Sequence, residues 1–157
     1  MWSWLGCVAR VEPTLPEPFD PACVLELTDG ACDTLTAAAF EPAPAGGYYV
    51  SVGVWARTPE AEVELTLRVL DRAGEPVAER SGYNVAMTGW SDALPIGCAV
   101  ADLRVEGTEP ERTDRVCSAP GQPFTVEGTV RSLVSDATAS ASVEVVGAFT
   151  DPWGQCE

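Results

Sequence analysis

The sequence predicts an all-β protein, an antiparallel β-sandwich of about seven to nine strands with jelly-roll or immunoglobulin-like connectivity. The prediction starts from residues 47–79, where two runs of alternating apolar and polar side chains follow each other. Successive side chains of a strand point to opposite faces, so each run has one buried and one solvated face. Turn-forming residues follow both runs, Thr58-Pro59 after the first and Asp71 to Gly74 after the second, which favours an antiparallel meander.

The other strands are expected from shorter alternating runs between turn signals. In the two central runs the apolar positions are Tyr48, Val50, Val52, Val54 and Ala56, and then Ala61, Val63, Leu65, Leu67 and Val69. Further strands are expected at 23–28, 34–40, 77–93, 97–106, 124–134 and 138–150, where 34–40 is also compatible with a single helical turn. Residues 107–122 carry charges and two prolines and are expected to form a long loop or an irregular edge, so no helix is predicted.

Residues 1–21 are expected to form an extended arm outside the sandwich domain, which spans 22–157. The arm contains four prolines, and proline lacks the N–H donor that a central strand needs. Its apolar start holds Trp2, Trp4 and Leu5, which we expect to dock on a neighbouring molecule; the alternative is packing on the chain's own body. The apolar stretch is too short for a signal peptide. Either a signal was removed before this numbering or none existed, and we expect a native start.

The charge of the chain argues against two classes of partner. Twenty-four acidic residues face nine basic ones, all arginine, which gives a net charge of −15 at pH 7. Nucleic-acid binding requires a basic protein surface that displaces counterions, and an anionic membrane surface likewise attracts positively charged protein segments. No run approaches the ~18 continuous apolar residues of a membrane span, so no span is expected.

Six cysteines predict up to three disulfides, with fifteen pairings open. The predicted pairs are Cys23 with Cys32 across a turn, Cys98 with Cys117 around the long loop, and Cys7 with Cys156 between the termini. Neither a zinc site nor redox chemistry is expected, because C-x-x-C spacing and histidine are both missing. Disulfides imply an oxidising location, which here means extracellular, cell surface or virion; the alternative is six buried thiols in a cytosolic protein.

Catalysis is not expected, because the sequence lacks the residue types that most mechanisms need. There is no histidine for a Ser-His or Cys-His pair and no lysine for Schiff-base chemistry. Carboxylates are abundant, so a small hydrolase with a carboxylate pair is kept as a third reading. No cofactor or metal is expected; Asp29 and Asp33 fit an Asx-turn better than a calcium loop.

The outer face of the first central run carries the candidate binding residues. Tyr49, Trp55 and Arg57 share one parity there, together with two small residues. If this face is open, the aromatic rings form a platform for a sugar ring or a protein partner. If it is covered, the same side chains extend the core. Trp90 is the further candidate for this site.

Residues 47–90 carry a pattern of Y-x-V-S-x-x-V-x-A-R, then V-x-L-x-L-x-V-x-D-x-x-G, then a lone tryptophan, Trp90. This pattern resembles the front half of carbohydrate-binding-module-type jelly rolls. Similar jelly rolls occur in phage tail and virion accessory proteins as adhesive or decorating units. The resemblance implies a binding or assembly module whose ligand is a sugar or a protein, and the region from Cys98 to Cys117 departs from the family.

These observations lead to the expectation of a non-catalytic structural or interaction module in an extracellular assembly. Candidates are a virion decoration or tail-associated protein and a cell-surface appendage subunit, docked through the arm on protein partners or on copies of itself. The alternative is a secreted carbohydrate-binding module that uses the aromatic strand face to hold a polysaccharide.

Overall fold

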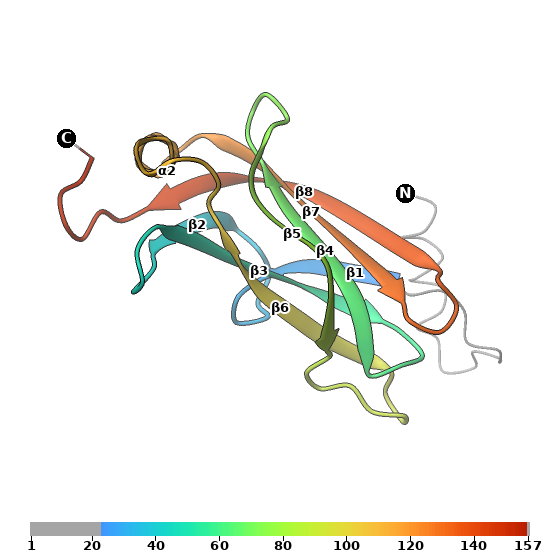
Figure 1. Cartoon of the computed structure of the whole chain (residues 1–157). Coiled ribbons are helices and arrows are strands. Elements are labelled where there is room, and N and C mark those ends of the chain that lie inside the picture. The colour runs from blue at the N-terminus through green and yellow to red at the C-terminus, as the bar shows by residue number, and fades with distance from the viewer. Residues whose placement is uncertain (1–22, 157) are drawn as a thin grey trace.

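The computed structural model describes residues 23–156, and these form eight strands and one short helix (Figure 1). The strands are β1 (Cys23–Asp29), β2 (Ala37–Pro42), β3 (Tyr48–Arg57), β4 (Glu62–Leu70), β5 (Pro76–Ala86), β6 (Ile96–Arg104), β7 (Pro123–Ser132) and β8 (Thr138–Phe149). The helix is α2 (Glu109–Cys117). The predicted arm lies outside the described residues, and so do Trp2, Trp4, Leu5 and Cys7.

The strands form two layers that pack face to face (Figure 1). In the first layer β3 pairs antiparallel with β1 along one edge and with β6 along the other. In the second layer the order is β8-β7-β4-β5. Strand β2 pairs with the end of β3 and, in parallel, with β8, so it links the layers on one side. On the other side, a bridge between Ala78 and Val105 joins them.

The connectivity distinguishes between the two predicted arrangements. The layers β1-β3-β6 and β8-β7-β4-β5 correspond to strands A-B-E and G-F-C-C′ of an immunoglobulin-like sandwich. The prediction of an all-β sandwich is therefore confirmed, with the immunoglobulin-like order. Eight of the expected runs form strands, at bounds close to those expected.

The expectation that the two central runs form an antiparallel meander is wrong, because β3 and β4 belong to different layers. Thr58, which is fully buried, donates its backbone N–H to the carbonyl of Pro95 at 3.1 Å. That bond directs the chain across the sandwich instead of back along β3. The second turn does form a hairpin, because β4 pairs antiparallel with β5 and the Asp71 N–H bonds to the Glu75 carbonyl.

The core lies between the layers and is built from the inward parity of each strand. Seven inward side chains of β3 and β4 are at most 1% exposed: Val50, Val52, Val54, Val63, Leu65, Leu67 and Val69. Each side chain of this size stabilises the fold by about 1.5–3 kcal/mol when fully buried. The layers are tightly packed at Gly128 of β7, where a Cβ would lie within 3 Å of side-chain atoms of Leu27 and Val54.

Two disulfides join described cysteines, Cys32 to Cys98 and Cys117 to Cys156, and Cys23 is also disulfide-bonded. The predicted pairs Cys23 with Cys32, Cys98 with Cys117 and Cys7 with Cys156 are therefore wrong. The loop after β1 folds back over the outer face of the first layer, which brings Cys32 to Cys98 on β6. The C-terminal segment passes the end of α2, which brings Cys156 to Cys117.

The expectation that residues 107–122 lack a helix is also wrong. Thr108 caps α2: its hydroxyl accepts the Glu111 N–H at 3.4 Å, and the Glu111 carboxylate accepts the Thr108 N–H at 2.8 Å. This reciprocal pair is a capping box, which satisfies two donors that a helix start otherwise leaves free. Pro110 is compatible with the helix because it lies in the first turn.

Replacing Cys32 and Cys98 together by alanine should lower the free energy of unfolding by about 4 kcal/mol. The bridge connects residues 66 apart in sequence, so its loss frees a long loop in the unfolded chain. Urea unfolding of the variant and the wild type, both without reductant, measures the difference. An unchanged midpoint and slope would contradict the expected contribution.

Candidate ligand-binding site

Three segments meet at one end of the sandwich and enclose a pocket of about 550 Å³ with an adjoining lobe of about 230 Å³. They are the β2–β3 turn (43–47), the stretch that leaves β6 and enters α2 (104–113), and the C-terminal residues 153–155. Figure 1 shows α2, the turn and the C-terminus at the same end. Both volumes are lined by Gly46, Gly47, Tyr48, Glu109 and Arg112, so we describe them together as the α2 pocket.

The floor of the α2 pocket is the tight turn between β2 and β3. The Ala43 N–H bonds to the Gly47 carbonyl at 2.9 Å, and Gly46 and Gly47 have φ angles of 97° and 79°. Such angles favour glycine, which leaves the floor without side chains. A Cβ on Gly47 would lie 3.6 Å from Nε of Arg112 and 3.9 Å from Nη2 of Arg104. The two guanidinium groups therefore converge on one point beside Gly47.

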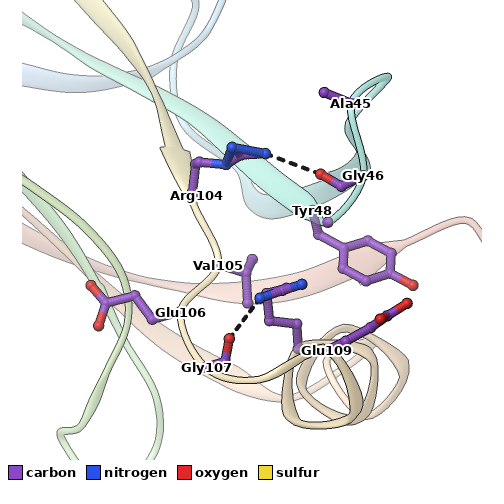
Figure 2. Close-up of a pocket in the computed structure, with 10 residues that line it drawn as sticks. Ala45, Gly46, Tyr48, Arg104, Val105, Glu106, Gly107 and Glu109 are labelled. Atoms are coloured by element: carbon purple, nitrogen blue, oxygen red, sulfur yellow. Dashed lines mark hydrogen bonds between the residues drawn. The ribbon is translucent and has the colours of Figure 1, made fainter.

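Backbone carbonyls hold both guanidinium groups in place (Figure 2). Arg104 donates to the Gly46 carbonyl at 3.0 Å, and Arg112 donates to the Gly107 carbonyl at 2.7 Å. Each guanidinium has five N–H donors, so these bonds use only part of its capacity. The Nε of Arg112 is buried and has no hydrogen-bond partner.

Within residues 23–156, neither guanidinium forms an ion pair with a carboxylate. The ion pairs between residues 23–156 all belong to Arg68 and Arg131, which lie on the outer face of the second layer. The chain has 24 acidic residues and nine arginines, yet among residues 23–156 these two arginines lie close together without an ion pair to a carboxylate. Their positive charge is available to a ligand.

Two aromatic side chains complete the wall and rim of the α2 pocket. Tyr48 is 6% exposed, and its ring packs edge-on against Phe149 at 5.6 Å between centroids. Its hydroxyl donates to the side-chain oxygen of Gln155 and lies 3.4 Å from the Thr113 hydroxyl. Trp153 is 63% exposed at the lobe. The site thus combines a buried ring, an open indole ring and polar groups.

The C-terminal segment is fixed to α2 by a covalent bond and an acidic turn. Cys156 is bonded to Cys117, the last residue of the helix. The Asp151 carboxylate accepts the N–H of Trp153 at 3.3 Å and that of Cys156 at 2.8 Å. Backbone hydrogen bonds, that of Gln155 first, lower the pKa of Asp151 below its ordinary value. These contacts keep the indole ring at the rim.

Two carboxylates also line the α2 pocket, and they point in different directions (Figure 2). Glu106 is turned away from Arg104 and Tyr48, whereas Glu109 points to the same side as the Tyr48 hydroxyl. The Glu106 backbone carbonyl accepts a bond from Arg115 at 2.7 Å. Glu109 is exposed and can accept hydrogen bonds from hydroxyl groups of a ligand.

The predicted aromatic face lies elsewhere, on the outer side of β3, and a loop crosses it. Tyr49 donates to Glu41 at 2.6 Å, and this hydrogen bond raises the pKa of its hydroxyl. Trp55 is half-buried, and its indole N–H donates to the Cys32 carbonyl at 2.9 Å. Between them a Cβ on Gly30 would lie 2.7 Å from Cβ of Ser51, so the loop packs on the strand.

The other two candidates of that face have different surroundings. Arg57 is 8% exposed at the end of β3. Trp90 packs against the core, and its indole N–H donates to the Thr58 carbonyl at 2.9 Å. The β3 face stays a predicted binding surface; the structure does not bring Tyr49 and Trp90 together with the residues of the α2 pocket.

The α2 pocket was not predicted from the sequence. One local signal was available, the Thr108 to Glu111 capping-box pattern, which marks the start of a helix and so indicates a packed element beside Arg104. The convergence of the two arginines had no local signal, because Arg104, Arg112 and Gly47 come from different elements.

The turn at Asp29 is an Asx-turn, as the sequence predicted. The Asp29 carboxylate accepts the N–H groups of Ala31 at 2.8 Å and Asp33 at 3.0 Å. Within the described part of the chain, no group of three or more potential metal ligands comes together. Over the same residues, no helix has the length and apolar character needed to cross a membrane.

Comparison with known proteins gives no family for this chain. No family model and no curated protein matches the sequence. Among solved structures, a glycosyl hydrolase family 2 member from Bacteroides cellulosilyticus aligns over 68% of this chain and 14% of its own, with 15% identity and a TM-score of 0.43. A β-glucuronidase from Ruminococcus gnavus aligns over 84% and 16%, with 15% identity and a TM-score of 0.34. The chain spans a small part of both, and at these scores neither supports a functional inference.

Replacing Asp151 by alanine should loosen the C-terminal turn at neutral pH. Because the folded pKa is lowered, the carboxylate stabilises the turn above its ordinary pKa of 3.8 and loses this effect as pH falls through the lower folded value. Hydrogen exchange of residues 151–156 should therefore be faster in Asp151→Ala than in the wild type at pH 7. Asp92→Ala, which removes an exposed loop carboxylate, is the control, and equal exchange in all three proteins would contradict the expectation.

Proposed function

We propose that this chain is a non-catalytic binding module of an oxidising, extracellular setting and that it holds its ligand in the α2 pocket. The observation that carries the proposal is the convergence of Arg104 and Arg112 beside Gly47 without a carboxylate partner in residues 23–156. A pocket of several hundred Å³ with a few convergent polar groups is the usual form of a small-ligand site.

The disulfides support the extracellular part of the proposal. Structural disulfides form and persist in oxidising compartments and are rare in the cytosol. Cys32–Cys98 ties the first layer together, and Cys117–Cys156 fixes one wall of the α2 pocket. The module therefore needs an oxidising location both for its fold and for its site.

The composition of the site supports binding over catalysis. The chain has no histidine and no lysine, so hydrolysis would depend on carboxylates. A glycosidase pair must flank the bond that it cleaves, whereas Glu106 and Glu109 point in different directions (Figure 2). Arginine and tryptophan are instead suited to holding a charged or planar group.

Trp153→Ala should abolish binding of the chain to its ligand on an array of glycans and peptides, while Tyr49→Ala should leave this binding unchanged. The first variant removes the exposed ring of the α2 pocket, and the second removes an aromatic ring of the β3 face. Array binding of the purified chain, confirmed by direct titration, measures both. Loss of binding in Tyr49→Ala with none in Trp153→Ala would move the site to the β3 face.

A second candidate function is a structural component of an extracellular assembly, such as a virion decoration or tail-associated protein or an appendage subunit. The observation that favours it is the edge of β8 over residues 138–145. This edge has no strand partner among residues 23–156, because β7 pairs with the other edge and the pairing of β8 with β2 begins only at Val146 of β8. Free strand edges are templates for an added strand.

Deleting residues 1–21 should reduce a native assembly to monomers of about the chain mass, if the arm docks on a neighbour. The native mass of the full chain and of the truncated chain, measured by sedimentation, tests this candidate. A multimer that survives truncation, or a full chain that is monomeric at all concentrations, would contradict it.

A further inference from the structure

We infer that the ligand of the α2 pocket is an acidic saccharide, with its carboxylate held by Arg104 and Arg112 and a sugar ring stacked on Trp153. The inference rests on the proposed binding function and adds the chemical class of the ligand. Three features of the pocket carry it: the unneutralised guanidinium pair, the open indole ring, and polar groups of both signs.

The guanidinium pair attracts an anionic group. Atoms of both groups lie within 4 Å of the position that a Cβ on Gly47 would take, so an anionic group in the pocket beside Gly47 lies near both positive charges. Each guanidinium gives one bond to a backbone carbonyl, Arg104 to Gly46 and Arg112 to Gly107, and has five N–H donors in all. A ligand carboxylate can accept from the remaining donors, and hydrogen bonds between charged groups are stronger than those between neutral groups.

The open indole ring selects a ligand that has a flat apolar face beside its charge. Trp153 is 63% exposed and lines the lobe that shares Arg112 with the main pocket. The backbone around Trp153 is held by the Asp151 carboxylate and by the Cys117–Cys156 bond, so the turn presents the ring at the rim without burying it. Aromatic rings in such positions stack on planar partners.

The remaining lining separates a saccharide from a bare anion. Glu109 repels every anion, the ligand carboxylate included, so that carboxylate belongs beside the arginines, whereas Glu109 can accept hydrogen bonds from sugar hydroxyls. Gln155 lies on the same lobe, where its side-chain oxygen accepts the bond from Tyr48 and its amide nitrogen is a further donor. Hydroxyl groups donate and accept at once, so a uronic acid matches carboxylate and amide groups together with the guanidinium pair.

Titration calorimetry of the full chain tests the inference with oligogalacturonate and oligoglucuronate and with their methyl esters. Esterification removes the charge and keeps the rings, so the acids should bind at least about tenfold more tightly than the esters. Arg112→Gln and Arg104→Gln should each weaken acid binding about tenfold. Arg72→Gln, which makes the same charge change on the exposed β4–β5 turn, should leave it unchanged.

The outcomes separate the ligand class from the site. Equal binding of acids and esters, lost in Trp153→Ala, would keep the α2 pocket as the site and overturn the acidic class. Preferential binding of an acidic peptide at the same arginines would overturn the saccharide. Binding of none of these probes would overturn the acidic-saccharide class, while the array experiment with Trp153→Ala and Tyr49→Ala tests the site separately. Because the acid–ester comparison uses the unaltered protein, it stands even if an arginine variant fails to fold, which circular dichroism monitors.

Discussion

Strand β3 is hydrogen-bonded along both edges, and the rest of the fold depends on this pairing. One edge binds β1 and β2, and the other binds β6 over its whole length. Its inward valines form the centre of the core, while its outer face receives the loop that carries Cys32. A charged residue at Val52, which is fully buried, would disturb both layers, because an unpaired buried charge is strongly unfavourable.

The α2 pocket is a consequence of this arrangement at one end of the sandwich. The first residues of β3 fix the turn at Gly46 and Gly47, and the last residue of β6 presents Arg104 opposite that turn. The connection from β6 to β7 contains α2, which supplies Arg112. The last segment of the chain then closes the lobe and is locked to α2 by a disulfide. Each wall of the α2 pocket therefore depends on the sandwich that positions the turn, the end of β6, α2 and the C-terminal segment.

The strands could be predicted from sequence because alternation is a local property, visible in runs such as Val63 to Val69. The assignment of strands to layers and the disulfide pairing could not be predicted, because both depend on the direction that the chain takes after each turn. Thr58-Pro59 looked like a hairpin turn, but the bond between Thr58 and Pro95 comes from residues 37 positions apart. The candidate site was missed for the same reason: the arginines become a pair only when the turn, strand and helix are assembled. The helix itself could have been predicted from the capping box at Thr108 and Glu111.

Tryptophan indole signals in a nuclear magnetic resonance titration with oligogalacturonate test the central claim most directly. Trp55 and Trp90 have indole N–H groups bonded to backbone carbonyls, while Trp153 stands exposed at the α2 pocket. We expect saturable shifts of the Trp153 indole and of the Gly46, Gly47 and Gly107 amides, with the Trp55 indole unmoved. A shift of Trp55 without Trp153, or no saturable shift at either ring, would contradict it.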